Sequence, residues 1–156
     1  MAQQDVLGKL FKYTLDGKMI EEVELPELGD VGSVSYHRET QTLLVSLNTF
    51  FSPGKLYELN EDDNSWSLFY EQESPLNTDN LEAKIEFVDA YDGKKIPVFI
   101  IHRKDIKLDG SNPVLLTGYG GFNHGISVSY IGTMASLVNR GGVYVRAGIR
   151  GGDGRH

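Results

Sequence analysis

Apolar and polar residues alternate along most of the first half of the chain, and this period of two predicts short β-strands. Turn signals separate the strands. Asp16-Gly17 favours a two-residue hairpin, and Ser52-Pro53-Gly54 and the acidic residues 61–64 mark later turns. The predicted strands cover residues 9–15, 19–25, 33–37, 42–47, 55–59 and 65–70. Strands and turns at this spacing are typical of an all-β sandwich, a barrel or a propeller.

The length of the repeat favours the propeller. Residues 33–72 hold four predicted strands in about 40 residues, the size of one blade, and residues 9–25 would be the last two strands of the blade before it. About one and a half blades would leave apolar faces uncovered, because repeat units need stacked neighbours. We therefore expect the chain to be part of a larger fold.

The second half follows a different pattern. Paired strands are predicted at residues 84–90 and 95–102, on either side of the turn Asp92-Gly93. The short apolar run at residues 113–117 suits a buried parallel strand. The apolar spacing in residues 127–139 predicts an amphipathic helix that ends near Gly141, and a strand follows at residues 143–149. This order is the opening of an α/β sheet.

Composition narrows the class of protein. The chain is 40% hydrophobic and 24% charged, as in globular proteins. Its net charge of -7 argues against nucleic-acid binding, and without cysteine it has no disulfide framework and no thiolate metal site. No apolar run approaches the roughly 20 residues that span a bilayer. The N-terminus has no signal-peptide pattern, so we expect a cytoplasmic protein without membrane contacts.

The charge is distributed unevenly between the two halves. Residues 1–80 carry 15 acidic and 5 basic residues, a net of -10, whereas residues 81–156 carry 7 acidic and 10 basic residues, a net of +3. This asymmetry indicates two structural units with a boundary near residue 80. The alternative is that acidic loops simply cluster in the first half.

A glycine-rich loop, Gly118-Tyr119-Gly120-Gly121-Phe122-Asn123, lies between the predicted parallel strand and the predicted helix. Ligands of open α/β sheets bind at the carboxyl ends of strands, and consecutive glycines let a backbone approach a ligand closely. The loop does not match a dinucleotide fingerprint or a P-loop. By itself it fits a binding site and a tight structural turn equally well.

The loop and its flanks together closely resemble the prolyl oligopeptidase family of serine peptidases. The loop itself, Thr117 to Asn123, is the most specific part. Further runs fit the family in order: Phe51-Ser52-Pro53-Gly54, Asp92-Gly93-Lys94-Lys95-Ile96-Pro97, Lys107-Leu108-Asp109-Gly110-Ser111-Asn112-Pro113, Gly141-Gly142-Val143 and Ile149-Arg150-Gly151-Gly152. The resemblance covers most of the chain.

This resemblance implies a seven-bladed β-propeller that caps an α/β-hydrolase domain and an enzyme that cleaves short peptides after proline. Residues 1–74 would be the last propeller blades, residues 75–82 a linker and residues 83–156 an incomplete α/β-hydrolase domain. Tyr119 matches the tyrosine whose hydroxyl helps to form the oxyanion hole. Phe122 matches an aromatic wall of the pocket for the substrate proline, and it favours the proline-specific branch over the oligopeptidase B branch.

The rest of the catalytic machinery is missing from the sequence. An α/β-hydrolase needs Ser, Asp or Glu, and His in that order, with the serine in Gly-x-Ser-x-Gly, and the chain has no such motif. None of His37, His102, His124 and His156 aligns with the catalytic histidine, and their spacing does not suit a metal. We expect no metal and no cofactor. Residues 153–156 also depart from the family, which usually continues with Gly-Glu-Tyr-Gly after the Arg-Gly-Gly that ends here at Gly152.

The sequence thus predicts part of a proline-specific serine endopeptidase that is inactive by itself and whose partners are short proline-containing peptides. Two alternatives remain open. One is a non-catalytic peptide-binding module that uses the same loop. The other is a related oligopeptidase or acylaminoacyl-peptidase branch.

Overall fold

The computed structural model describes residues 2–4, 7–122 and 124–151 of the chain. These residues form two compact units. One comprises Met1–Glu73 with Ser127–Tyr130, and the other comprises Ser74–Ile126 with Ile131–His156. The sequence predictions that concern Asn123, Gly152 and residues 153–156 lie outside the described residues.

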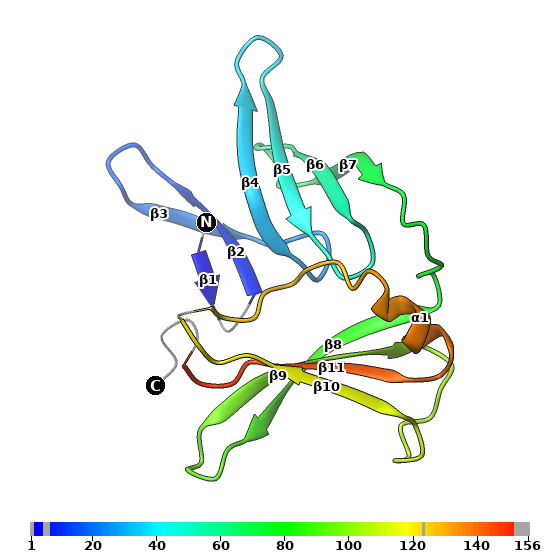
Figure 1. The fold of residues 1–156 in the computed structure, drawn as a ribbon. Helices are drawn as coiled ribbons and strands as arrows, with labels where there is room; N and C mark the ends of the chain where they lie inside the picture. Colours follow the sequence, from blue (N-terminus) through cyan, green and yellow to red (C-terminus); the bar gives the residue numbers. More distant parts are fainter. Residues whose placement is uncertain (1, 5–6, 123, 152–156) are drawn as a thin grey trace. The chain divides into compact units, whose positions relative to one another are not determined.

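The first unit contains two antiparallel sheets (Figure 1). The three-stranded sheet has the order β1-β2-β3 and consists of β1 (Ala2–Gln4), β2 (Leu7–Tyr13) and β3 (Met19–Val23). The four-stranded sheet follows chain order through β4 (Asp30–His37), β5 (Thr42–Asn48), β6 (Gly54–Leu59) and β7 (Trp66–Gln72). Each neighbouring pair is antiparallel, so this second sheet is a simple meander. The strands predicted here are confirmed, and β1 was not predicted.

Alternate residues of the strands build the core of the first unit. Val45 and Leu47 of β5 are 0% and 1% exposed, and the adjacent strand β6 contributes Tyr57 and Leu59. Residues two apart in a strand point to the same face of the sheet, which is why the sequence alternates there. Full burial of each such side chain stabilises the fold by roughly 1.5–3 kcal/mol.

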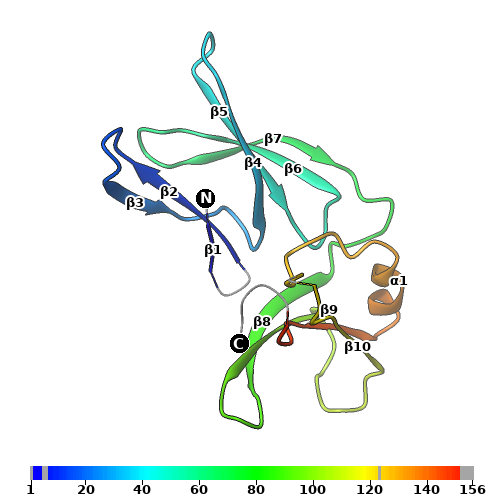
Figure 2. The same cartoon turned by 60° about the vertical axis from the view of Figure 1, so that its left-hand side comes forward.

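The last strand of the meander, β7, leaves apolar side chains exposed on both of its faces. Consecutive residues Leu68, Phe69 and Tyr70 of β7 are 51%, 60% and 57% exposed, although neighbours in a strand point to opposite faces. Figures 1 and 2 show that β7 lies at the edge of an open sheet. Apolar side chains exposed on an unpaired edge strand favour association with other chains.

The second unit is built on one mixed sheet with the strand order β10-β11-β9-β8. The hairpin of β8 (Leu81–Asp89) and β9 (Lys95–Arg103) is antiparallel, and β11 (Val143–Ala147) pairs antiparallel with β9. The edge strand β10 (Val114–Gly118) is parallel to β11, in a register that pairs Val114 with Val143 and Gly118 with Ala147. A parallel pair requires a crossover, and the connection between these strands includes the helix α1 (Met134–Asn139).

The core of the second unit lies where α1 packs against β9 and β11. Phe99 and Ile101 of the central strand β9 are both 0% exposed. The helix contributes Ala135 and Val138, which are also fully buried and lie three residues apart, on one face of a helix.

The helix predicted over residues 127–139 is wrong in its first half. Only Met134–Asn139 is helical, and Ser127–Tyr130 groups with the first unit, where Val128 is 1% exposed. The physical reason is local, since residues 127–133 are rich in serine and β-branched residues and include Gly132, at a φ of 52°. These residue types have low helix propensity. The predicted end of the helix is confirmed: Gly141 adopts a φ of 89°, and its N–H donates to the carbonyl of Val138.

The prediction for residues 113–117 is half right. The strand is parallel, as expected, but it is not buried: Val114, Leu115 and Leu116 of β10 are 60%, 39% and 65% exposed. The reason is that β10 lies at the edge of the sheet, where only β11 pairs with it.

The regular secondary structure of the described residues is thus nearly all sheet, and the sheets are open (Figure 2). This confirms the β-rich part of the predicted fold class, whereas the division into propeller blades and an α/β-hydrolase portion stays a prediction. No helix in the described residues is long and apolar enough to cross a membrane.

Candidate functional site

The loop that carries Tyr119 and Phe122 follows β10 directly, and residues 148–151 follow β11. Because β10 and β11 are parallel neighbours, their carboxyl ends share one edge of the sheet, and the two loops meet there. The sequence therefore placed the loop at the correct end of the strand.

Gly120 and Gly151, one in each loop, are required by close packing of the two backbones. A Cβ atom on Gly120 would lie 2.1 Å from the carbonyl oxygen of Arg150, and one on Gly151 would lie 2.0 Å from the carbonyl oxygen of Gly120. Gly151 also has a φ of 94°, which favours glycine. From the sequence we expected the glycines to let a ligand approach the backbone closely. In the structure, the close neighbour of Gly120 is instead the Arg150 carbonyl of the same chain.

Tyr119 is half exposed and folds back over its own loop. Its hydroxyl oxygen lies 3.5 Å from the position that a Cβ on Gly121 would occupy. Its ring centroid is 6.4 Å from that of His124, whose backbone N–H donates to the carbonyl of Gly121. The Tyr119 side chain is 54% exposed, and its hydroxyl is a hydrogen-bond donor that a bound molecule can use.

Phe122 stands in the same loop with 88% of its surface exposed. Its φ is 53°, in the left-handed region, which costs a residue other than glycine about 1–3 kcal/mol. Strained backbone of this kind concentrates at ligand-binding sites. Tyr119 and Phe122 thus lie on one exposed turn. The predicted roles, an oxyanion-hole donor and a wall of the proline pocket, both require an exposed side chain.

Sequence reasoning did not identify the residues that tie down the neighbouring loop. Arg150 forms an ion pair with Asp92 in the turn between β8 and β9, and its guanidinium carbon lies 5.5 Å from the ring centroid of Tyr91. The hydrogen bond from Arg150 lowers the pKa of Asp92, and the same bond raises the pKa of Arg150. The signal was present in the sequence, because both charged residues lie in runs that resemble the peptidase family.

The histidines within the described residues occupy unrelated places. His37 lies on β4, where Nδ1 is 3.0 Å from the hydroxyl oxygen of Thr40. His102 is buried on β9: its Nδ1 donates to the carbonyl of Arg103, and its Nε2 lies 3.5 Å from a carboxylate oxygen of Glu82. The described part of the chain also has no group of three His, Asp or Glu residues that could hold a metal ion.

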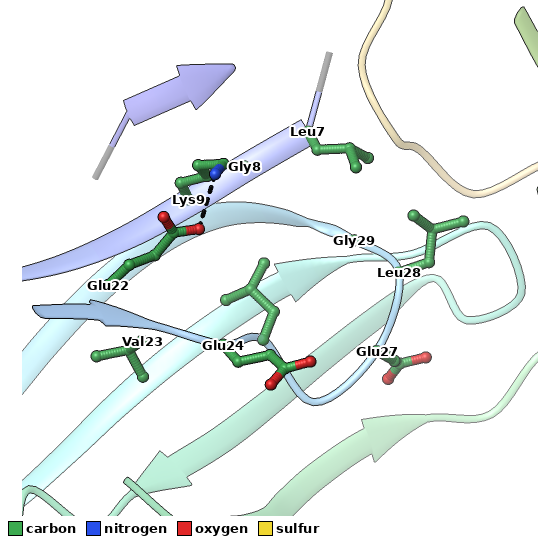
Figure 3. A pocket seen from close by; sticks show the side chains of 10 residues that line it. Leu7, Gly8, Lys9, Glu22, Val23, Glu24, Glu27, Leu28 and Gly29 are labelled. Carbon is green, nitrogen blue, oxygen red and sulfur yellow. Dashed lines mark ion pairs between the residues drawn. The ribbon is translucent and has the colours of Figure 1, made fainter. Parts of the chain in front are cut away.

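One pocket in the first unit has no counterpart in the sequence predictions. It has a volume of about 440 Å³ and lies beside β2, β3 and the segment that follows β3 (Figure 3). Leucines and glutamates supply much of its lining, among them Leu7, Leu25, Leu28, Glu22, Glu24 and Glu27. Lys9 forms an ion pair with Glu22 at 2.8 Å. Its described lining residues are Leu, Val, Gly, Lys and Glu, and none of these types carries a hydroxyl or thiol nucleophile.

Comparison with proteins of known sequence shows that the chain is similar to part of several peptidases. No family profile matches it. The prolyl endopeptidase of Elizabethkingia miricola is 29% identical over 149 residues, which cover 96% of this chain and 21% of that protein. Prolyl oligopeptidase A of Galerina marginata is 30% identical over 155 residues, 96% of this chain and 21% of that protein. An uncharacterized peptidase of Sinorhizobium fredii is 32% identical over 143 residues, which cover 91% of this chain and 20% of that protein.

Solved structures agree with these matches. A prolyl endopeptidase superimposes with a TM-score of 0.79 at 30% identity, and a post-proline cleaving enzyme from Rickettsia typhi with a TM-score of 0.71 at 27% identity. Each match covers 96% of this chain and 22% of the other. The resemblance inferred from the sequence is confirmed, and the chain spans about a fifth of the length of the relatives that it matches.

Proposed function

We propose that this chain, which is a relative of the prolyl oligopeptidase family along nearly its whole length, forms part of a serine-type endopeptidase that cleaves short peptides after proline. The relatives named above are prolyl endopeptidases and peptidases. One solved relative, prolyl oligopeptidase B of Galerina marginata, is bound to a 35-residue peptide substrate.

The observation that carries the proposal is the position of Tyr119. Its phenol stands on an exposed loop at the carboxyl end of a parallel strand, where open α/β sheets bind their ligands. In peptide hydrolysis, serine attacks the carbonyl carbon and negative charge develops on the carbonyl oxygen. A phenol that donates a hydrogen bond to this oxygen stabilises the transition state more than the ground state. We assign this role to Tyr119.

Phe122 is assigned to the pocket for the substrate proline. Its ring is almost fully exposed and lies three residues from the proposed oxyanion donor. A flat aromatic wall suits a pyrrolidine ring, which has apolar faces and no hydrogen to donate. The left-handed backbone of Phe122 supports this role, because such strain is retained where function requires a particular side-chain direction.

The same proposal assigns each part of the chain to a domain of the peptidase. Residues 1–74 would be the end of a β-propeller, residues 75–82 a linker and residues 83–156 the first part of an α/β-hydrolase domain. The four-stranded meander of β4 to β7 supports the first assignment. The parallel pair β10 and β11, with α1 in the connection between them, supports the last.

We further propose that the 156-residue chain does not hydrolyse peptides by itself, because it lacks a Gly-x-Ser-x-Gly nucleophile motif. The test is hydrolysis of a fluorogenic Gly-Pro peptide together with labelling by a fluorophosphonate, which reacts with activated serines. We expect neither. Turnover or labelling of the purified chain would contradict the absence of a nucleophile.

The role of Tyr119 is tested in a chimera. This chain replaces the aligned 149 residues of the Elizabethkingia miricola prolyl endopeptidase, so that the larger protein supplies the remaining residues. We expect the chimera to cleave the Gly-Pro peptide, and Tyr119→Phe to lower kcat by about 10²–10³-fold with little change in KM. The matched control is Tyr36→Phe, which removes a hydroxyl from a tyrosine of similar exposure, 50%, on β4 and outside the loop. A Tyr119→Phe chimera with the kcat of its parent would refute the assignment.

The second candidate, a non-catalytic peptide-binding module, is favoured by one observation, the exposure of Phe122 beside Tyr119. It predicts that the isolated chain binds a Gly-Pro peptide and that Phe122→Ala abolishes binding. It also predicts that the active chimera is indifferent to Tyr119→Phe. Calorimetric titration of the chain with the peptide therefore separates the two functions.

A further inference from the structure

We propose that Arg150 is a positioning residue for Tyr119. It ties residues 148–151 to the turn between β8 and β9, and these residues hold the loop that carries the tyrosine. The effect of Arg150 on catalysis rests on the proposed function. The coupling between the Arg150 side chain and the position of the tyrosine loop can be measured in this chain alone.

The side chain of Arg150 makes two contacts with that turn. Its Nη1 atom donates to Oδ2 of Asp92, and its guanidinium stacks over Tyr91, 5.5 Å from the ring centroid. The Arg150 and Asp92 side chains are 34% and 30% exposed, so solvent only partly screens the pair. A planar guanidinium can pair and stack at once, which a lysine ammonium cannot do equally well.

The backbone of the same residues forms the surface against which the tyrosine loop lies. The Arg150 carbonyl would be 2.1 Å from a Cβ on Gly120, and the Ile149 side chain would be 2.9 Å from it. Gly118 also lies against Ile149, at ordinary contact distance. A displacement of Arg150 therefore removes the support directly beneath the residues on either side of Tyr119.

The start of this segment has an attachment of its own. The N–H of Gly148 donates to the carbonyl of Pro97 on β9 at 2.8 Å, and this bond does not depend on the Arg150 side chain. We therefore expect a local release of residues 149–151 and of the tyrosine loop, with the core strands unaffected.

Hydrogen exchange of the full 156-residue chain tests the coupling. In Arg150→Gln and in Asp92→Asn, we expect the amides at the end of β10 that pairs with β11, at residues 117 and 118 where the tyrosine loop begins, to exchange about tenfold faster than in the parent chain, with β8 and β9 unchanged. The charge-exchanged double variant, Asp92→Arg with Arg150→Asp, should recover most of the protection. Arg150→Lys should fall between the parent and Arg150→Gln.

The matched control is Asp89→Asn. It removes the Asp89–Lys95 ion pair from the same hairpin, where both side chains are well exposed, at 67% and 60%. We expect no acceleration in the loop. Equal acceleration in this control, no acceleration in Arg150→Gln, or acceleration spread over the core strands would each overturn a local positioning role.

Kinetics of the chimera separate this inference from the proposed function. Arg150→Gln should lower kcat with little change in KM. It should add little on a Tyr119→Phe background, because Arg150 acts through the hydrogen bond that Tyr119→Phe already removes. If Tyr119→Phe leaves kcat unchanged, the proposed function fails while the exchange result still decides the coupling. If Tyr119→Phe lowers kcat and Arg150→Gln does not, the positioning role fails.

Discussion

Replacement of Gly120 by alanine is a sharp test of how the tyrosine loop is packed. The new Cβ would lie 2.1 Å from the carbonyl oxygen of Arg150, whereas real Cβ contacts essentially never fall below 3.0 Å. The two backbones must therefore part by about 0.9 Å, since 3.0 less 2.1 is 0.9. The Arg150 side is held through Asp92, so we expect the tyrosine loop to be the part that moves.

The expected cost follows from this displacement. Overpacking of this kind typically destabilises a fold by about 1–3 kcal/mol. At a tenfold change in equilibrium per 1.4 kcal/mol, this corresponds to roughly 5- to 150-fold faster exchange of the amides of β10 and β11. In the chimera the same shift displaces Tyr119, and a misplacement of about 1 Å can lower turnover by roughly 100-fold.

Gly110→Ala is the matched control. Gly110 has a φ of 87°, and no atom lies within 4 Å of the position that a Cβ would take there, so alanine costs only backbone strain, about 1 kcal/mol. Gly120 has no positive φ, so its cost is purely steric. The predicted clash is contradicted if Gly120→Ala accelerates exchange in β10 no more than Gly110→Ala does, or if the chimera keeps its kcat.

Three further outcomes follow from the packing and the charges. Phe99→Ala, in the centre of the second unit, should lower the free energy of unfolding by about 3–5 kcal/mol, measured by urea denaturation. Tyr57→Phe should cost about 1.5–3 kcal/mol in the first unit, read from Trp66 fluorescence, because the buried phenol donates to the Glu27 carboxylate. The pairing of Asp92 with Arg150 lowers the pKa of Asp92, so its contribution is present above the ordinary value of 3.8 and is lost as pH falls below it. The protection that the Asp92–Arg150 pair gives to the loop should therefore stay constant between roughly pH 5 and 8, once the intrinsic pH dependence of amide exchange is subtracted, and a loss of protection in this range that Asp92→Asn abolishes would contradict this assignment.

Local sequence patterns predicted the strands well because alternation is set by the faces that each strand buries. Val45 and Leu47 show this most clearly. The same patterns failed where burial depends on neighbours. The apolar run of β10 indicated a buried strand, but the edge of the sheet leaves Leu116 65% exposed. Residues 127–130 have apolar spacing that suits a helix, yet they form no regular secondary structure and group with the first unit, where Val128 is buried.

The candidate site was only partly predictable. The motif identified Tyr119 and Phe122, because their residue types carry the resemblance. It could not show the left-handed backbone of Phe122, since aromatic residues rarely adopt that conformation. Nor could it show that the glycine at position 120 serves contact with Arg150, which lies 30 residues further along the chain.

The central claim is that Tyr119 donates to the oxyanion in post-proline cleavage. Its most direct test is a crystal structure of the active chimera with a peptidyl prolinal, an aldehyde that forms a hemiacetal with the catalytic serine. We predict that the Tyr119 hydroxyl oxygen lies about 2.7–3.1 Å from the hemiacetal oxygen, with the Phe122 ring against the pyrrolidine. A structure in which Tyr119 stays folded over Gly121 and another group donates to the hemiacetal oxygen would contradict the claim.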